Sequence, residues 1–132
     1  AGQAGMVQPD RQAVDADGET GLIYIDGVVS HAIRKGPLLR VAGVATDQLW
    51  APEDISVREP RAEEFAVAEA TMDAMPWPRS ALLYARIDLV RDDDGLPQLL
   101  ELELAEPSLF LGLGVGAAAR LADAVASRIR SE

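Results

Sequence analysis

The 132 residues are enough for one domain with a sizeable hydrophobic core, and an apolar content of 48% excludes a disordered chain. The chain has no cysteine, which excludes disulfides, zinc–cysteine sites and thiol catalysis and fits a reducing compartment such as the cytoplasm. The net charge of −10 argues against a nucleic-acid partner. We expect neither a membrane span nor a secretory signal, because no apolar run approaches the ~18 residues that a span needs.

The first half of the chain predicts strands and a long loop. It begins Ala-Gly-Gln-Ala-Gly without an initiator methionine, so we expect a fragment, a processed product or a tagged protein. Residues 6–8 resemble the end of a strand, and a polar stretch follows them. Residues 20–25 and 28–34 predict two strands joined by a two-residue Asp-Gly turn at 26–27. Residues 35–59 are rich in glycine and proline, which predicts a long loop with short strand pieces, and such loops are often functional.

Two helices are predicted, one before and one after a second hairpin. The first covers about residues 60–74, and Pro76 and Pro78 end it. Its apolar residues recur at helical spacing as Phe65, Ala68, Met72 and Met75, and the acids off this line are Glu63, Glu64, Glu69 and Asp73. The second covers about residues 116–130, with an apolar stripe of Ala118, Leu121, Val125 and Ile129. This order of elements predicts an α+β domain with an antiparallel sheet and packed helices.

The hairpin of residues 84–107 is the most informative stretch, because acids and aliphatic residues alternate along it. Strict alternation is the period of a half-buried strand. Asp94-Gly95 predicts a two-residue turn, and that turn fixes the pairing of the strands. The expected pairs are Asp93 with Leu96, Asp88 with Glu101 and Arg86 with Glu103.

This register places two acids, Asp88 and Glu101, directly opposite each other. Like charges in that position destabilise a sheet by roughly 0.2–1 kcal/mol. A nearby cation should offset the repulsion, and both Arg86 and a hard divalent ion bound by carboxylate oxygens are candidates. The other interpretation is a polar face that is simply solvated, and the pattern alone favours neither.

Two glycine- and acid-rich motifs have structural interpretations. Residues 112–117 match the dinucleotide pattern G-x-G-x-x-A, but the 15 residues after Ala117 are too few for the required helix and strand. A glycine-rich turn into a helix is favoured instead. The acidic run 92–95 lacks the final acid of a twelve-residue calcium loop, so it is interpreted as a hairpin turn.

The basic residues of the first half allow two interpretations. Arg34, Lys35 and Arg40 form a cluster that either keeps the surface soluble or contacts phosphate. His31 has no evident catalytic partner in the sequence, so a structural or substrate-edge role is favoured over catalysis.

The motifs of the second hairpin, Arg86-x-Asp88, Asp-Gly and Leu-Leu-Glu101-x-Glu103, resemble the C-terminal part of ATP-grasp ligases. In D-alanine–D-alanine ligases and prokaryotic glutathione synthetases the corresponding hairpin reads R-x-D, Asp-Gly and L-x-E-x-N, with proline soon after. Residues 6–9 resemble the hinge that lies against adenine in that family, and residues 18–20 the acidic strand that follows it. Residues 30–35 resemble a segment of bacterial members, some of them near the cyclo-ligase of cycloserine synthesis. The resemblance covers about residues 6–126.

The resemblance implies the C-terminal lobe of an ATP-grasp fold, in a ligase that joins a carboxylate to an amine or related nucleophile through an acyl phosphate. It implies ATP and Mg²⁺, or Mn²⁺, as cofactors, with two ions on the phosphates. The implied metal ligands are Asp88, Glu101 and Glu103, with Glu101 bridging both ions. Arg86 would steady the transferring phosphoryl group, and Arg40 would contact phosphate or substrate. The implied nucleotide contacts are Val7, Gln8 and Pro9 to adenine and Glu19 to ribose.

The chain departs from the family pattern in two respects. Glu103 stands where the family usually has Asn, which keeps an oxygen ligand and adds a negative charge. Residues 1–132 also correspond to a single lobe, so the lysine-bearing lobe and the substrate domain would lie upstream, and this chain alone would be catalytically incomplete. The implied partners are ATP and an unidentified carboxylate, and exposed edge strands could favour a homo-oligomer. The alternative is a stand-alone, non-catalytic module that binds a metal or a partner.

Overall fold

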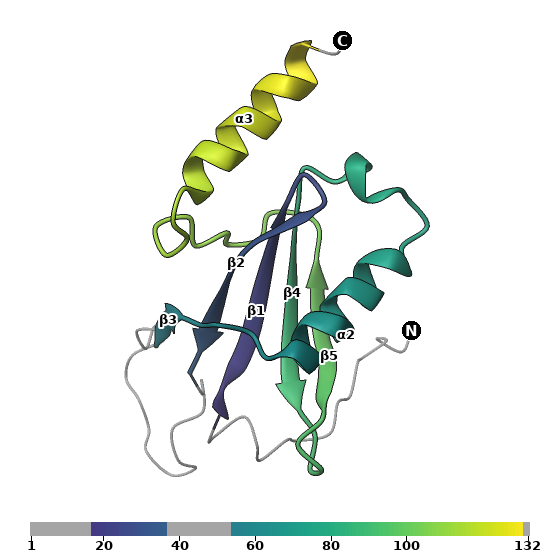
Figure 1. Ribbon diagram of the computed structural model, residues 1–132, viewed down its shortest axis with the longest axis vertical. Helices are drawn as coiled ribbons and strands as arrows, with labels where there is room; N and C mark the ends of the chain where they lie inside the picture. Colours follow the sequence, from purple (N-terminus) through teal and green to yellow (C-terminus); the bar gives the residue numbers. More distant parts are fainter. Residues whose placement is uncertain (1–16, 37–53, 131–132) are drawn as a thin grey trace, which may run out of the picture.

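The structure is a computed structural model that describes residues 17–36 and 54–130, and within them five strands form one antiparallel sheet accompanied by two α-helices (Figure 1). In chain order the elements are β1 (Glu19–Ile25), β2 (Val28–Lys35), β3 (Ile55–Val57), α2 (Ala62–Asp73), the 3₁₀ turn η1 (Arg79–Ala81), β4 (Tyr84–Arg91), β5 (Pro97–Glu103) and α3 (Ala117–Arg130). The strand order β3-β2-β1-β4-β5 makes β1 the central strand. The predicted α+β class with an antiparallel sheet is confirmed.

Two apolar clusters cover the two faces of this sheet. On one face α2 packs across β4 and β5 (Figure 1), and its Ala68 and Met72 meet inward residues of the central strands. On the other face the segment 109–113 and the first turns of α3 pack on Ile23, Ile25 and Ile33. Successive residues of a strand point to opposite faces, so β1 contributes to both clusters and is buried almost throughout.

Helix α2 differs from its predicted stripe near its first residues. Ala68 and Met72 are buried as predicted, but Phe65 remains 38% exposed. Glu64 was predicted to lie off the apolar line, and this is wrong because its side chain is only 2% exposed. The Glu64 carboxylate accepts hydrogen bonds from the Thr20 hydroxyl at 3.0 Å and from the Arg61 backbone N–H at 2.8 Å. The acid is therefore held between the sheet and the first turn of the helix.

Helix α3 buries only part of the predicted stripe: Leu121 packs on the apolar cluster of β1 and β2, whereas Ala118 is exposed. Its buried residues are Ala117 and Ala124, whereas Val125 and Ile129 are 37% and 69% exposed. The helix extends beyond the end of the sheet (Figure 1), so the sheet covers only part of the apolar stripe. On the side that faces the body, Arg128 donates a 2.8 Å hydrogen bond to the Asp26 carboxylate. Among the described residues, neither helix is long and apolar enough to cross a membrane.

The first hairpin has the predicted two-residue turn. Ile25 pairs with Val28, and the turn residues Asp26 and Gly27 both have positive φ angles, of 52° and 78°. Positive φ at both central positions is the geometry of a type I′ turn, which Asp-Gly favours.

The second hairpin has a longer turn than predicted. The Asp92 N–H donates to the Leu96 carbonyl at 2.9 Å, so the loop has three residues and the predicted pairing of Asp93 with Leu96 is wrong. The Asp92 carboxylate accepts hydrogen bonds from the Asp94 and Leu96 N–H groups, at 3.0 and 2.8 Å. Gly95 completes the turn with a φ angle of 79°. A type I turn followed by a left-handed glycine is the usual three-residue hairpin loop.

A bulge in β5 offsets the extra turn residue. Leu89 pairs with Leu99, but the next pair is Asp88 with Glu101, so Leu100 is the additional residue on β5. Beyond this bulge the pairing returns to the predicted register. The predicted pairs Asp88–Glu101 and Arg86–Glu103 are therefore confirmed although the predicted turn was wrong.

Candidate active site

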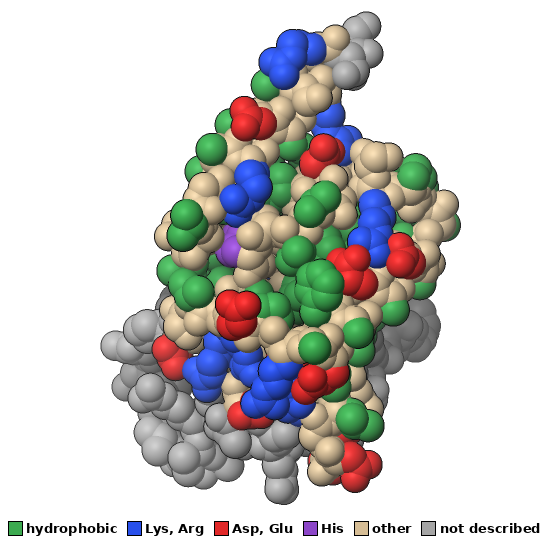
Figure 2. Space-filling model, viewed as in Figure 1, with side chains coloured by type: hydrophobic (Ala, Val, Ile, Leu, Met, Phe, Trp, Pro, Cys, Tyr) green, Lys and Arg blue, Asp and Glu red, His purple; other side chains and the backbone are tan. Residues whose placement is uncertain are grey.

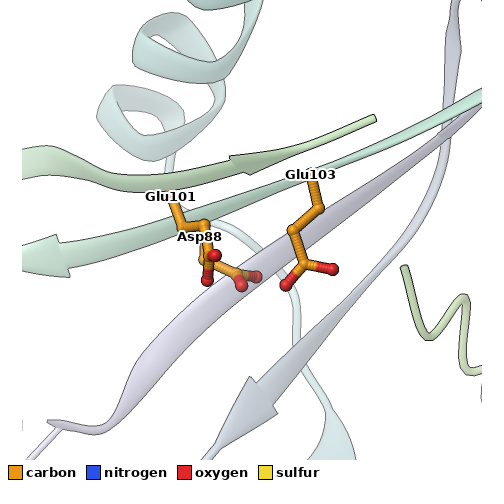
Figure 3. Close-up of side chains that lie close together, drawn as sticks. All are labelled: Asp88, Glu101 and Glu103. Carbon is orange, nitrogen blue, oxygen red and sulfur yellow. The ribbon is translucent and has the colours of Figure 1, made fainter. Parts of the chain in front are cut away.

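Three carboxylates from the second hairpin converge on the sheet face opposite α2. Asp88 comes from β4, and Glu101 and Glu103 come from β5 (Figure 3). One oxygen of each lies within 4.8 Å of the others. Asp88 is 1% exposed, the side chain of Glu103 is 25% exposed, and Glu101 is exposed. The interpretation of this face as simply solvated is therefore wrong for Asp88.

The guanidinium of Arg86 holds two of these acids. Its Nε lies 3.1 Å from both Asp88 oxygens, and its Nη2 lies 3.0 Å from Asp88 Oδ2. The same Nη2 donates to Glu103 Oε1. Arg86 also donates to the Ser108 carbonyl at 3.2 Å, and its Cζ lies 5.8 Å from the centre of the Phe110 ring. At 6% exposure, this arginine ties the acids to the segment that follows β5.

A second cation, Lys35, reaches the acids from β2. Its Nζ lies 2.8 Å from Asp88 Oδ2 and 3.2 Å from Glu19 Oε2. Burial lowers the pKa of Lys35, but the hydrogen bond and negative charge of Asp88 and the charge of Glu19 outweigh it and raise the pKa above its ordinary value. Lys35 is therefore a charged ammonium at the centre of the cluster.

The position of the Asp88 carboxylate depends on a glycine in the central strand. Gly21 of β1 pairs with Asp88 on one side and with Ile33 on the other. A Cβ atom at Gly21 would lie 2.9 Å from Asp88 Oδ1. The sequence analysis gave no role to Gly21, although a glycine inside a predicted strand is a signal of such a close approach.

The cluster carries more acid than base. Four carboxylates, those of Asp88, Glu19, Glu101 and Glu103, face the two cations Arg86 and Lys35, which leaves an excess of two negative charges. In the described part of the chain, the Glu101 side chain has no hydrogen bond or ion pair, although its backbone belongs to the β4–β5 pairing. Carboxylate oxygens with uncompensated charge are the ligands that Mg²⁺ and Mn²⁺ prefer. The donor set therefore fits a divalent ion.

The other predicted site residues fall into two groups. Glu19 lies beside the cluster through its ion pair with Lys35. Val7, Gln8, Pro9 and Arg40 lie outside the described residues. Arg34, the neighbour of Lys35, bonds instead to Asp54 Oδ2 and the Asp17 carbonyl, so these two members of the predicted basic cluster have separate partners.

His31 has partners that the sequence did not reveal. Its Nε2 lies 3.0 Å from the Leu109 carbonyl, which can only accept, so Nε2 carries a proton. Its Nδ1 lies 3.0 Å from the hydroxyl of Ser30, and Arg120 of α3 donates to that same hydroxyl. The imidazole packs on Gly114, where a Cβ would lie 2.6 Å from the ring. The glycines before α3 thus make room for a structural histidine.

The amino-acid sequence is similar to that of a known biosynthetic protein. No protein-family model matches the chain. The cycloserine biosynthesis protein DcsG of Streptomyces lavendulae is 39% identical over 131 residues, which cover 95% of this chain and 42% of DcsG. The chain therefore spans less than half the length of this relative.

Solved structures share the fold. The crystal structure of the D-cycloserine synthetase DcsG superposes with a TM-score of 0.70 at 38% identity, over 92% of this chain and 41% of that protein. The ATP-grasp ligase PsnB, in complex with a minimal precursor, gives 0.52 at 21% identity over 82% and 34% of the two chains. The D-alanine–D-alanine ligase of Bacillus anthracis gives 0.51 at 23% identity over 86% and 41%. By sequence and by fold, this chain is therefore related to the ATP-grasp ligases, as its acidic hairpin predicted.

Proposed function

We propose that this chain is the Mg²⁺–ATP-binding, C-terminal lobe of an ATP-dependent ligase that joins a carboxylate to an amine or related nucleophile through an acyl phosphate. The observation that carries the proposal is the convergence of three carboxylates beside a buried arginine, in a hairpin whose pairing opposes Asp88 to Glu101. The similarity to DcsG, a D-cycloserine synthetase, supports a ligase.

Asp88, Glu101 and Glu103 would hold the divalent ions. The side chain of the exposed Glu101 lies beside the other two acids, and no hydrogen bond or ion pair within the described residues restrains it. When bound, such ions neutralise the charge of the ATP phosphates and of the transferring phosphoryl group. Glu103 in place of the family's Asn adds a negative charge, which would tighten metal binding.

The chain's own cations would act on the phosphates and the acyl phosphate. Arg86 is fixed in orientation by Asp88 and Glu103, so its guanidinium is preorganised beside the metal ligands. Preorganised donors stabilise developing charge without reorganising during the reaction. Arg86 would therefore steady the transferring phosphoryl group. Contacts of Glu19 to ribose, of residues 7–9 to adenine and of Arg40 to phosphate or substrate stay predictions.

We place the lysine-bearing lobe and the substrate domain in the part of a longer ligase that this chain does not span, since it covers 42% of DcsG. ATP would then lie between that lobe and the acidic face of this sheet. The substrate carboxylate would be selected largely by the part outside this chain.

Titration with Mn²⁺, followed by electron paramagnetic resonance, tests the metal site. The 132-residue chain is titrated with and without a non-hydrolysable ATP analogue, beside Glu101→Ala and the control Asp123→Ala, which removes an exposed carboxylate of α3. We expect saturable binding that the analogue strengthens, that Glu101→Ala weakens and that Asp123→Ala preserves. Binding that the analogue leaves unchanged would favour the non-catalytic metal-binding module. Equal binding by the parent and Glu101→Ala would refute the site.

A further inference from the structure

Lys35 is the one cation of the acidic cluster that comes from outside the hairpin, among the residues the structure describes. It lies at the end of β2, and its side chain crosses the central strand β1 to reach Asp88 on β4. The Lys35 side chain is 16% exposed and that of Asp88 is 1% exposed. The ion pair is therefore largely shielded from solvent, where charges interact more strongly than at a surface.

A glycine of the central strand leaves space for the Asp88 carboxylate. Gly21 lies between Ile33 of β2 and Asp88 of β4, and its missing side chain leaves the space that the Asp88 carboxylate occupies. A Cβ there would approach both neighbours, at 2.9 Å from Asp88 Oδ1 and 3.2 Å from Ile33 Cγ1. The close packing of Asp88 against the Gly21 backbone therefore holds the carboxylate that Lys35 contacts.

Asp88 Oδ2 already has two cationic partners. The Arg86 Nη2 lies 3.0 Å and the Lys35 Nζ 2.8 Å from this oxygen. A divalent ion that binds Asp88 must therefore approach an oxygen that an ammonium occupies, and the two cations repel each other. Glu19 of β1, 3.2 Å from Lys35 Nζ, offers the ammonium a second partner.

We propose that Lys35 is an internal counter-ion of the metal site. It stabilises the acidic cluster when no metal is present, and it weakens metal binding by competing for Asp88. When a divalent ion binds, the ammonium moves toward Glu19 and becomes available to an ATP phosphate. Metal and nucleotide then bind cooperatively, because the phosphate takes the ammonium that the metal displaces. This inference rests on the proposed metal site and assigns Lys35 as a positioning residue of that site.

The inference predicts that removal of the lysine has opposite effects on stability and on metal affinity. In Lys35→Met, the metal-free chain should melt at a lower temperature, because Asp88 keeps only Arg86 as a counter-charge. The same variant should bind Mn²⁺ about tenfold more tightly in the absence of nucleotide, because the competing charge is gone. The ATP analogue should then strengthen Mn²⁺ binding less than it does in the parent chain. If Lys35 had only a structural role, its removal would lower both the stability and the metal affinity of the chain.

The experiment combines thermal denaturation with Mn²⁺ titration by electron paramagnetic resonance on the 132-residue chain. Lys35→Gln, which keeps a hydrogen-bond donor without the charge, serves where Lys35→Met is too unstable, and Lys35→Arg should restore parent-like metal affinity. Arg34→Met is the matched control, since this neighbour pairs with the exposed Asp54 and does not contact the cluster.

The outcomes separate the inference from the proposed function. Tighter Mn²⁺ binding by Lys35→Met or Lys35→Gln, with parent-like binding by Arg34→Met, supports the counter-ion. Equal or weaker binding by both Lys35 variants, with saturable binding by the parent, overturns the counter-ion and leaves the metal site intact. A parent chain that binds no more Mn²⁺ than Glu101→Ala overturns the metal site and the counter-ion together.

Discussion

Two buried carboxylates, Glu64 on one face of the sheet and Asp88 on the other, have almost equal exposure but differ in the charged groups around them. Glu64 is 2% exposed and Asp88 is 1% exposed. The oxygens of Glu64 meet Thr20, the Arg61 N–H, and the guanidinium groups of Arg58 and Arg91 at 3.5 and 3.2 Å. Figure 2 shows basic and acidic side chains gathered around the end of α2 where the helix begins.

The difference lies in how completely the charges are compensated. Around Glu64, a single buried acid meets two arginines, a hydroxyl and a backbone donor. Arg91 also pairs with Glu63 and Asp17, but their side chains are 50% and 43% exposed, so Glu64 is the one buried acid among its partners. Around Asp88, three further carboxylates share two cations, and Glu101 is exposed. Buried charge that is fully paired indicates a structural role, and acids in excess of their counter-charges indicate a ligand. Burial alone does not distinguish the two.

The largest expected effect belongs to the exposed acid. In the longer ligase that we propose contains this chain, Glu101→Ala should abolish ATP turnover, because it removes a proposed metal ligand. The free energy of unfolding should change by less than about 0.5 kcal/mol, because the side chain is exposed. A coupled ADP-release assay and denaturant unfolding measure the two quantities. Full activity in this variant would remove the metal assignment.

Glu64→Ala should lower the stability of the fold and leave metal binding unchanged. Removal of this acid leaves Arg91, whose side chain is 9% exposed, without its closest buried counter-charge. Loss of one partner from a buried ion pair typically costs about 3–5 kcal/mol. We expect a loss of this size in urea unfolding, with Mn²⁺ affinity unchanged in the molecules that stay folded. A drop in Mn²⁺ affinity without a loss of stability would invalidate the distinction between the two faces.

Gly21→Ala should affect both the packing of the sheet and the binding of metal. The added Cβ would lie 2.9 Å from Asp88 Oδ1, and the ion pairs with Arg86 and Lys35 hold that carboxylate in place. We expect a destabilisation of about 1–3 kcal/mol, which is typical of overpacking, together with weaker Mn²⁺ binding. Gly112→Ala is the control, since a Cβ there meets nothing within 4 Å. Equal unfolding free energies for the two variants would contradict the close approach at Gly21.

The smallest expected effect concerns a half-buried polar group, His31. Burial, the largest contribution, lowers the pKa of His31 below its ordinary value, against the raising effect of the Leu109 and Phe110 backbone groups. A histidine with a lowered folded-state pKa binds protons more readily when the chain is unfolded. Its contribution to stability is therefore complete above about pH 6.5, the unfolded pKa, and is lost as the pH falls through the folded pKa.

Comparison with His31→Asn isolates this contribution, because the chain has no other histidine. Between pH 7 and pH 5.5 the parent should lose more unfolding free energy than the variant, as measured by urea unfolding at each pH. Identical slopes for the two proteins would show that the imidazole is not held neutral by the fold.

Local patterns in the sequence predicted much of the fold and the central part of the site. Alternation and the Asp-Gly signals located both hairpins, because these features depend on neighbours along one hairpin. The predicted opposition of Asp88 and Glu101 holds because the bulge at Leu100 offsets the longer second turn. The contact of Lys35 with Asp88 was not predicted, because it requires β1 to pair with β4 across nearly sixty residues of chain. Burial of Glu64 was missed for a similar reason. Hydrophobic periodicity predicts that an acid faces solvent, but Glu64 is buried because arginines from outside the helix pair with it.

The extra residue at Leu100 has a consequence for how the acidic hairpin could vary. The residues of the turn and the acids are separated by a bulge, where the strand already accommodates one residue that has no partner. A homologue with a two-residue turn would reach the same opposition of Asp88 and Glu101 with a regular β5. Changes in loop length at the distal end of this hairpin can thus be absorbed at position 100, and the geometry of the ligands is insulated from them.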